Sequence, residues 1–455
     1  MNATATARDL GDDFYAPLKA RGPEIEARYR GLTPASAELH DRAERLLPGG
    51  YTRDSIIRKP YAPYIARGEG ATLVDRDGRR ITDMWFNATS LPLGHADGRV
   101  VAAVNAQLKL GSSYFAPSES EIDMAGVICE RLRSAERVRF ANSGSEAVMF
   151  ALRFARAFTG RDVVVKFEGS YHGSYDDVYW SISPPPDRFG APDQPTAVPD
   201  SAGLTGSAGR VLVLPYNDTD ALERTVRRHG GEIAAILVEP LANRMGLIAP
   251  KPGFLERMRE LCDARGMVLI FDEVIAFRLG FNGAQGLLGV RPDLTTLGKI
   301  IGGGFPVGAV AGRADILALS EPRRPGRVTH AGTFNANPIT MAAGKATMDA
   351  LTEDVLAALN AGGERIRSSL GELCRGLPLQ ITGAGSLFKI SATPHEITDY
   401  RTAATADREW QEIASLALLN EGFLLPPSLH GCLATATTDD HVERFLAAFA
   451  SLLGR

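Results

Sequence analysis

Cysteine is scarce in this sequence. Its 455 residues contain only four cysteines, and no two of them form a CxxC pair. Thiols this few and this widely spaced cannot build a disulfide framework or a zinc knot. We therefore expect reduced thiols, a cytoplasmic location and no bound metal. The four are Cys129, Cys262, Cys374 and Cys432.

An excess of charge and a long apolar run are also missing. Fifty Lys and Arg residues stand against 54 Asp and Glu residues, a net charge of -4, so a partnership with nucleic acid or a membrane surface gains no support. No window is apolar enough to span a membrane, and residues 1–10 lack the apolar core of a signal peptide. Hydrophobic residues at 44% and charged residues at 23% are typical of a globular protein. The length of 455 residues leaves room for two or three packed units.

The middle of the chain alternates short apolar runs with helical patterns. Continuous apolar strands separated by helices predict an α/β fold whose mostly parallel sheet is covered by helices on both faces. Ligands of such sheets bind at the carboxyl ends of the strands. The apolar runs are 138–140, 163–165, 211–213, 235–238 and 267–271, and the helical patterns are 146–158, 219–228 and 253–265.

The flanking regions differ from this middle part. Residues 23–47 have helical spacing, and a hairpin is predicted over 72–81 with its turn at Asp77-Gly78. After about Ala336 the pattern changes to helices with short strands, which indicates a second, α+β unit. We expect residues 76–335 to form a large domain, and residues 1–75 and 336–455 to form a smaller one.

Residues 181–209 are rich in Pro, Gly, Ser and Asp and show little periodicity. A loop of this length in a compact domain is usually functional or disordered. Two interpretations stay open, a lid at an entrance and a plain surface loop.

Three segments that follow apolar runs carry candidate site residues. Ser143-Gly144-Ser145 opens a helix, where glycine and free amides suit a phosphate, although a simple helix cap would also explain it. Tyr171 could stack on a flat cofactor and His172 could tune it, or both could serve packing. Glu239 ends a further strand, where a buried carboxylate needs a partner.

Asp272 and Lys299 are the most informative pair. Asp272 closes an apolar run, and Lys299 lies among the glycines of a turn that continues to Gly304. A pyridoxal phosphate enzyme needs an acid that keeps the pyridine nitrogen protonated and an amine that forms the Schiff base. Nucleotide-binding alternatives fail on spacing, because Asp293 breaks the Walker pattern and Val307 replaces the third Rossmann glycine.

The motifs together resemble those of one family. From about Pro48 to near the C-terminus the chain resembles a class III aminotransferase of fold type I, in the branch that holds glutamate-1-semialdehyde aminomutase and β-amino acid aminotransferases. The resemblance implies a large domain with a mostly parallel, seven-stranded type of sheet and a smaller α+β domain. The segments that carry it are Arg139–Ala147, Tyr171–Gly173, Glu239-Pro240, Phe271–Val274, Asp293–Lys299 and Ala331–Phe334.

The resemblance also implies roles at a cofactor site. Lys299 would bind pyridoxal 5'-phosphate covalently and relay a proton, while Asp272 would pair with the pyridine nitrogen. Val274 and Tyr171 would lie near opposite faces of the ring. Thr333 would reach the phosphate of a neighbouring subunit's cofactor, which implies a homodimer with shared active sites. In the same region Gly144 and Ser145 would hold the phosphate.

Substrate recognition is less firmly indicated. Arg53 matches the stretch where this branch binds a substrate carboxylate, a task that suits a guanidinium. Asn243-Arg244 stands where many relatives have glycine-asparagine, and Arg244 could be a second anion contact or a loop residue. Residues 427–431 depart from the family, since they contain neither the glutamate of the aminomutases nor the arginine of some β-amino acid enzymes.

The sequence thus predicts an aminotransferase that moves an amino group from a carboxylate-bearing amine, with a β-amino acid favoured, to a keto acid through a Schiff base on Lys299. A glutamate-1-semialdehyde type of 2,1-aminomutase and an amino acid racemase are the alternatives on the same scaffold. A cofactor-binding regulator of transcription is a further class, but the basic N-terminal DNA-binding module of such proteins is missing.

Overall fold

The computed structural model of the protein describes residues 7–204 and 209–455. Residues 1–6 and 205–208, which include parts of the N-terminal stretch and of the 181–209 loop discussed above, lie outside the description. The described chain forms two compact units. Unit 1 comprises residues up to Asp97 together with Leu359–Ile397 and Thr405–Arg455, and unit 2 comprises Gly98–Ala358 and Thr398–Ala404.

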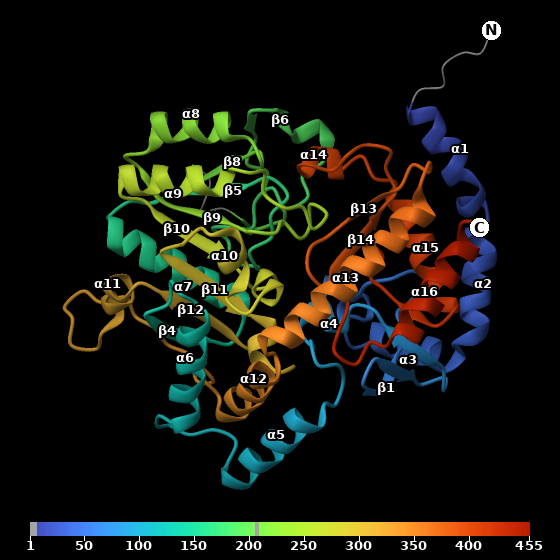
Figure 1. The fold of residues 1–455 in the computed structure, drawn as a ribbon, viewed down its shortest axis with the longest axis horizontal. Helices are drawn as coiled ribbons and strands as arrows, with labels where there is room; N and C mark the ends of the chain where they lie inside the picture. Colours follow the sequence, from blue (N-terminus) through green and yellow to red (C-terminus); the bar gives the residue numbers. More distant parts are fainter. Residues whose placement is uncertain (1–6, 205–208) are drawn as a thin grey trace. The chain divides into compact units, whose positions relative to one another are not determined.

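Unit 2 is built on a seven-stranded sheet (Figure 1) with the order β4-β12-β11-β10-β9-β5-β8. Strand β12 runs antiparallel to both of its neighbours, β4 and β11. Every pair of neighbouring strands that does not include β12 is parallel. The mostly parallel sheet predicted from the apolar runs is therefore confirmed. The strands are β4 (Arg137–Ala141), β5 (Val163–Phe167), β8 (Val211–Leu214), β9 (Ile233–Val238), β10 (Val268–Asp272), β11 (Leu294–Gly298) and β12 (Gly308–Gly312).

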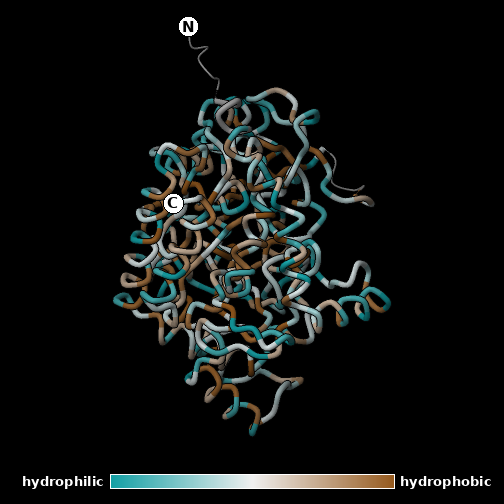
Figure 2. The backbone as a smooth tube through the Cα atoms, turned by 90° about the vertical axis from the view of Figure 1, so that its right-hand side faces the viewer, coloured by the Kyte–Doolittle hydropathy of each residue, from teal (hydrophilic) through white to brown (hydrophobic). Residues whose placement is uncertain are grey.

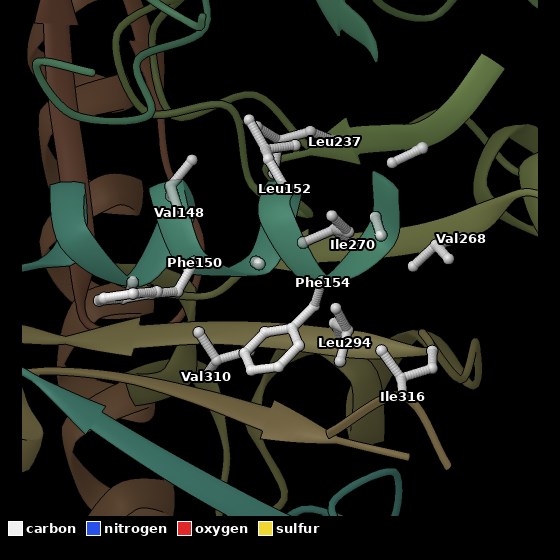
Figure 3. Packing of buried hydrophobic residues seen from close by; sticks show 14 of the residues in the cluster. Val148, Phe150, Leu152, Phe154, Leu237, Val268, Ile270, Leu294, Val310 and Ile316 are labelled. Carbon is white, nitrogen blue, oxygen red and sulfur yellow. The ribbon is translucent and has the colours of Figure 1, made fainter. Parts of the chain in front are cut away.

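Helix α7 (Gly144–Thr159) covers one face of this sheet. Its apolar side chains pack against alternate residues of the strands, as Figure 3 shows for Phe154 beside Leu294 and Val310. Helix α9 (Phe254–Arg265) lies on the opposite face, because Phe254 contacts Phe167 with ring centroids 5.6 Å apart. Val164 packs in the α7 cluster, and residues three apart on a strand point to opposite faces.

The remaining elements of unit 2 surround this core. The helices α8 and α9 lie side by side in Figure 1, and α12 packs against α5 and α6. The further elements are α5 (Gly98–Leu110), α6 (Glu119–Arg131), α8 (Thr219–His229), α10 (Gly283–Leu288), α11 (Ala314–Leu317), α12 (Pro338–Ala350) and α14 (Tyr400–Ala403).

Unit 1 contains two small sheets, with the orders β1-β2-β3-β15 and β13-β14-β16. The predicted hairpin is confirmed, since β2 and β3 pair antiparallel on either side of Gly78, whose φ is 81°. Its elements are α1 (Ala7–Ala20), α2 (Gly22–Leu32), α3 (Pro34–Glu44), β1 (Ile65–Glu69), β2 (Thr72–Asp75), β3 (Arg80–Asp83), α4 (Phe86–Thr89), β13 (Gln380–Thr382), β14 (Leu387–Ser391), α15 (Arg408–Asn420), β15 (Phe423–Leu424), β16 (His430–Cys432) and α16 (Asp439–Leu452). Helix α13 (Glu353–Cys374) begins in unit 2 and ends in unit 1.

One predicted element is wrong in detail. The helix expected over 23–47 is two helices, α2 and α3, separated at Thr33, whose φ is -135° and ψ is 46°. The cause is Pro34, because a residue before proline is pushed out of the helical region.

The boundaries between the two units also differ from the predicted ones. They lie at 97/98 and 358/359, later in the chain than the predicted 75/76 and 335/336. Strand β3 pairs with β15 near the C-terminus, so the hairpin and the residues up to Asp97 belong to unit 1. Helix α12 packs on the glycine turn that follows Lys299 and so belongs to unit 2. Periodicity alone does not reveal either contact.

The described part of the 181–209 stretch is folded. It contains a short hairpin of β6 (Gly190–Ala191) and β7 (Gln194–Pro195). Arg401 of α14 fixes this hairpin by donating to the carbonyl oxygens of Phe189, Gly190 and Ala191. A role as a lid stays a prediction.

None of the helices in residues 7–204 and 209–455 is long and apolar enough to cross a membrane. All four cysteines are free thiols.

The turn after Lys299 gives a first prediction. Gly303 has a φ of 57°, and a Cβ there would lie 2.5 Å from the carbonyl oxygen of Ala343. We expect Gly303→Ala to lower the free energy of unfolding by about 2–4 kcal/mol in urea unfolding, since it adds both backbone strain and a clash. Gly371→Ala is the control: nothing lies within 4 Å of the added Cβ on α13, so a gain of about 0.5–1 kcal/mol is expected. Equal stability of the two variants would contradict the prediction.

Candidate active site

Six strands of unit 2 end at the same edge of the sheet, and five of them precede predicted site residues. The strands β5, β9, β10 and β11 are parallel, and β4 shares their direction because β12 between β4 and β11 is antiparallel to both. Each of the five is followed within a few residues by a predicted site residue, as expected for ligand sites of such sheets. These residues are Ser143, Gly144 and Ser145 after β4, Tyr171 and His172 after β5, Glu239 after β9, Asp272 at the end of β10 and Lys299 after β11.

Asp272 and His172 form a buried pair. The Nδ1 atom of His172 lies 2.8 Å from Oδ2 of Asp272, and the two residues are 1% and 6% exposed. Burial lowers the pKa of His172, although the hydrogen bond and charge of Asp272 oppose this and Lys166 adds to it. A neutral ring therefore donates its Nδ1 proton to the carboxylate. The other oxygen of Asp272 accepts from the backbone amide of Val274 at 3.1 Å.

Glu239 is the second buried carboxylate of the site. Its oxygens accept from the amides of Tyr171 at 3.2 Å and Asn243 at 3.3 Å. Burial raises the pKa of Glu239 to about 8; the charge of Asp272 acts in the same direction, and the two amides and Lys299 act against it. The carboxyl is therefore poised to exchange a proton near neutral pH.

Lys299 lies in a strained turn. Its φ is 49°, a left-handed value that costs a residue other than glycine on the order of 1–3 kcal/mol. Packing of the glycines that follow enforces this backbone: a Cβ at Gly302 would lie 2.6 Å from Val307, and one at Gly344 of α12 would lie 2.0 Å from the oxygen of Ile301. Strain of this kind persists only where the surroundings determine it, as at a functional site.

The protonation of Lys299 depends on burial and on the two carboxylates of the site. Burial lowers the pKa of its amine, while the negative charges of Asp272 and Glu239 act in the opposite direction. A lysine with a lowered pKa has more of the neutral amine that can act as a nucleophile.

The start of α7 forms a cradle for an anion. Ser143 is the N-cap, and its Oγ accepts from the amide of Glu146 at 3.2 Å. The amides of Gly144 and Ser145 have no partner among residues 7–204 and 209–455. The hydroxyl oxygen of Ser145 accepts from the amide of Ser174 at 3.0 Å, so its proton is free to be donated. Both explanations of this motif, cap and anion site, are compatible with the geometry.

Val274 and Tyr171 lie close to this cradle and to the strand ends. A Cβ at Gly144 would lie 3.2 Å from Val274, and one at Gly298 would lie 3.4 Å from it. Tyr171 is 37% exposed, and the guanidinium of Arg244 lies 5.6 Å from its ring centroid. Arg244 also donates to the hydroxyl of Ser183 at 3.3 Å.

Two predicted site residues are not brought to these strand ends within unit 2. Arg53 belongs to unit 1, where it is exposed in extended backbone with a φ of -153°. Thr333 is exposed in the segment before α12. Asn335 in the same segment accepts from the side chain of Asn142 at 2.8 Å, next to the cradle.

Lys166 is a residue of this region that the sequence analysis does not single out. It is 0% exposed in the centre of β5 and donates to three carbonyl oxygens in the segment that carries Tyr171 and His172. The available signal was a lone lysine inside an apolar run, which is costly to bury without partners.

The family profile of the class-III aminotransferases matches residues 57–424. The chain belongs to this family. The glutamate-1-semialdehyde 2,1-aminomutase of Methanothermobacter thermautotrophicus is 41% identical over 423 residues, covering 92% of this chain and 98% of that protein. Among solved structures, an omega-transaminase from Sphaerobacter thermophilus has a TM-score of 0.88 and 44% identity, covering 92% of this chain and 97% of that one. A β-phenylalanine aminotransferase from Variovorax paradoxus has a TM-score of 0.88 and 36% identity, covering 96% and 97%.

Class-III aminotransferases are pyridoxal phosphate enzymes of fold type I, and so is this one. The residues at the strand ends fit the cofactor. The first amides of α7 suit its phosphate, Asp272 suits a protonated ring nitrogen, and Nε2 of the buried His172 has no hydrogen-bond partner in the described part of the chain. The bound cofactor supplies an aldehyde that takes amines and a ring that withdraws electrons.

Glu239 of this class-III aminotransferase gives a prediction about pH. Because burial raises its pKa from 4.5 to about 8, the folded state takes up a proton between these values. The free energy of unfolding should therefore fall as the pH rises across that window. We expect the cofactor-free protein to lose on the order of 2 kcal/mol more than Glu239→Gln between about pH 6 and about pH 8.5 in urea unfolding. Glu256→Gln, on the exposed side of α9, should keep the native dependence. Parallel pH profiles of native protein and Glu239→Gln would contradict the assignment.

Proposed function

We propose that this chain transfers an amino group on a carboxylate-bearing substrate, with Lys299 as the residue that binds the cofactor and carries the proton. The observation that supports this most directly is the convergence of Lys299, Asp272 and Glu239 at one sheet edge. There burial lowers the pKa of Lys299 while the two carboxylates act to raise it, and Lys299 acts to lower the pKa of Glu239, which burial raises. Asp272 holds the ring nitrogen protonated, and His172 fixes the orientation of the Asp272 carboxylate.

The other contacts follow from the same arrangement. The amides of Gly144 and Ser145 hold the phosphate, assisted by the hydroxyls of Ser143 and Ser145. Val274 packs on the ring from one side and Tyr171 from the other. Arg53 and Arg244 are the proposed carboxylate contacts, and neither forms an ion pair among residues 7–204 and 209–455.

Two reactions fit this chemistry. A 2,1-amino shift of the glutamate-1-semialdehyde type is supported by the names of the curated relatives, which are 38–42% identical to this chain. Transamination is supported by the omega-transaminase, which is 44% identical, and a β-amino acid as its substrate is supported by the β-phenylalanine aminotransferase, which is 36% identical. The relatives thus support the amino shift at least as well as the transamination that the sequence favours. A racemase finds no support among the relatives named here.

Stoichiometry separates the two reactions. The enzyme is offered glutamate-1-semialdehyde alone, and separately β-phenylalanine with pyruvate or 2-oxoglutarate. Consumption of the keto acid in step with the β-amino acid identifies a transaminase, because an amino shift within one molecule needs no acceptor. Conversion of the semialdehyde to an isomer of equal mass, without any keto acid, identifies the aminomutase. If the enzyme turns over neither substrate, the proposal as a whole is contradicted.

We also propose that the enzyme is a cytoplasmic homodimer. Several apolar side chains of α5 and nearby loops are exposed in the described chain, among them Leu110 at 74% and Phe334 at 60%. Figure 2 shows apolar segments along the lowest part of the chain, the position that α5 has in Figure 1. Asn337 joins these loops by donating to the carbonyl oxygen of Ser112 at 2.8 Å. An exposed apolar surface next to the cofactor cradle favours a second copy of the chain as its partner.

The dimer gives a prediction for size measurements. Phe115, in the loop after α5, is exposed like Leu110. Light scattering should give twice the mass of one chain for the native protein, and one chain mass for the double variant Leu110→Asp/Phe115→Asp, because charges would be buried without partners. Leu46→Asp, at a residue of unit 1 that is 72% exposed, should remain dimeric. A monomeric native protein would contradict the proposal.

A further inference from the structure

Lys166 is a buried cation without a role in the chemistry described so far. It stands in β5 between two neighbouring strands, with no exposed surface. Its ammonium group donates to the carbonyl oxygens of Ser170 at 3.0 Å, Val178 at 3.1 Å and Trp180. Three carbonyl acceptors match the three donors of an ammonium group, which explains how the charge is tolerated there.

The three carbonyls belong to the two ends of one segment. Ser170 begins the segment 170–180, and Val178 and Trp180 end it. Tyr171 and His172 lie just inside its first end. The ammonium group of Lys166 therefore closes the segment into a loop that carries two residues of the proposed cofactor site.

Other contacts also hold this loop, and one of them joins its flanks, since the backbone amide of Gly169 donates to the carbonyl oxygen of Ser181 at 2.7 Å. The hydroxyl of Ser170 donates to the carbonyl oxygen of Phe167 at 2.6 Å. Trp180 packs against Val211 and Val213 of β8. The ammonium group of Lys166 adds a side-chain contact that reaches both ends of the segment at once.

We propose that Lys166 is a positioning residue for the cofactor site: its buried ammonium group holds segment 170–180 closed and thereby keeps the ring of His172 against Asp272. This inference rests on the proposed function, because it takes His172 and Asp272 as parts of a site that binds pyridoxal phosphate.

The charges around Lys166 act on its pKa in both directions. Burial lowers the pKa of Lys166 to about 7, the nearby Asp200 and Glu239 act against this, and Arg244 adds to it. The same ammonium group disfavours a second positive charge on His172, whose pKa is lowered chiefly by burial. A neutral His172 that donates to Asp272 through Nδ1 keeps Nε2 as an acceptor.

The test compares Lys166→Met, which removes every donor, with Lys166→Gln, which keeps two but loses the charge. We expect Lys166→Met to weaken pyridoxal phosphate binding about tenfold or more, because three buried carbonyls lose their donor and the loop opens. Lys166→Gln should lie between this variant and the native protein. The visible circular dichroism of the bound cofactor should change in the same order, and amide hydrogen exchange should increase within 170–180.

A control and the contrary results complete the test. Lys345→Met, at a lysine that pairs with Asp349 on the surface of α12, should leave all three measurements unchanged. Native affinity and native circular dichroism in folded Lys166→Met would overturn the inference. If that variant does not fold, Lys166→Gln decides by the same criteria. Loss of folding in both variants would also overturn it, since Lys166 would then serve the whole unit and not this segment.

These measurements do not depend on finding the substrate. Cofactor affinity, circular dichroism and amide exchange are read without turnover. A failure of the proposed reaction with a normal response of the Lys166 variants would therefore be distinguishable from a failure of the inference itself.

Discussion

Lys299→Ala is expected to lower amino transfer by about four orders of magnitude or more and to abolish covalent attachment of the cofactor. Within the described chain, Lys299 is the lysine whose pKa is lowered by burial while the charges of both Asp272 and Glu239 act to raise it. No neighbouring side chain that the structure describes offers a second amine with that placement. The loss should therefore be close to complete.

The measurement separates attachment from turnover. After borohydride reduction of the native enzyme, mass spectrometry should find the cofactor on the peptide that contains Lys299. The alanine variant should carry no such label, although it should still bind some cofactor through the α7 cradle. Lys345→Ala, on the surface of α12, should keep turnover within about twofold of the native value. Labelling of a different lysine in the native enzyme would remove Lys299 from its proposed role.

Asp272→Asn is expected to have the second largest effect. Asparagine keeps the size of the side chain and can still accept from the amide of Val274, but it lacks the negative charge. Without that charge the ring nitrogen of the cofactor is no longer held protonated, and the ring withdraws electrons less strongly. We expect turnover to fall by roughly a hundredfold to a thousandfold, the magnitude found when one well-placed electrostatic contact is removed from an active site.

Folding and cofactor affinity provide the checks on this prediction. Asp272→Asn should unfold at a urea concentration near that of the native protein, so that the loss of turnover is a loss of chemistry. Asp315→Asn, in an exposed ion pair with Arg313, serves as the matched control and should be nearly silent. Turnover of Asp272→Asn within about threefold of native would show that the carboxylate does not act on the ring.

The strand ends that carry the candidate site could be predicted because each follows a continuous apolar run. Asp272 closes such a run, and Glu239 closes another, so both were expected at the carboxyl edge of a parallel sheet. The pairing of His172 with Asp272 could not be predicted from periodicity, since it depends on how the segment after β5 folds back.

Strand β12 shows why another part of the sheet was missed. Its sequence, Gly308 to Gly312, has few of the bulky residues typical of strands. The structure explains this composition, because a Cβ at Gly308 would lie 2.0 Å from the oxygen of Ser143 and one at Gly312 would lie 2.3 Å from that of Asp293. Close approach of other backbone segments requires glycine there, and this constraint is visible only in three dimensions.

Substrate choice could not be predicted from the sequence in the same way. Arg53 lies in unit 1, and the departure at residues 427–431 lies there too. The motifs that identify the family do not include these residues, so they carry little information about the substrate.

The position of α14 has a practical consequence for protein engineering. Residues Thr398–Ala404 belong to unit 2 although the chain on either side of them belongs to unit 1. Arg401 forms an ion pair with Glu168, and Tyr400 donates to the carbonyl oxygen of Pro184. A chimera that joins this N-terminal portion to the C-terminal portion of a homologue would thus also replace Arg401, which fixes the 190–195 hairpin, and Tyr400, which contacts Pro184. Functional hybrids are expected only when both segments come from the same parent.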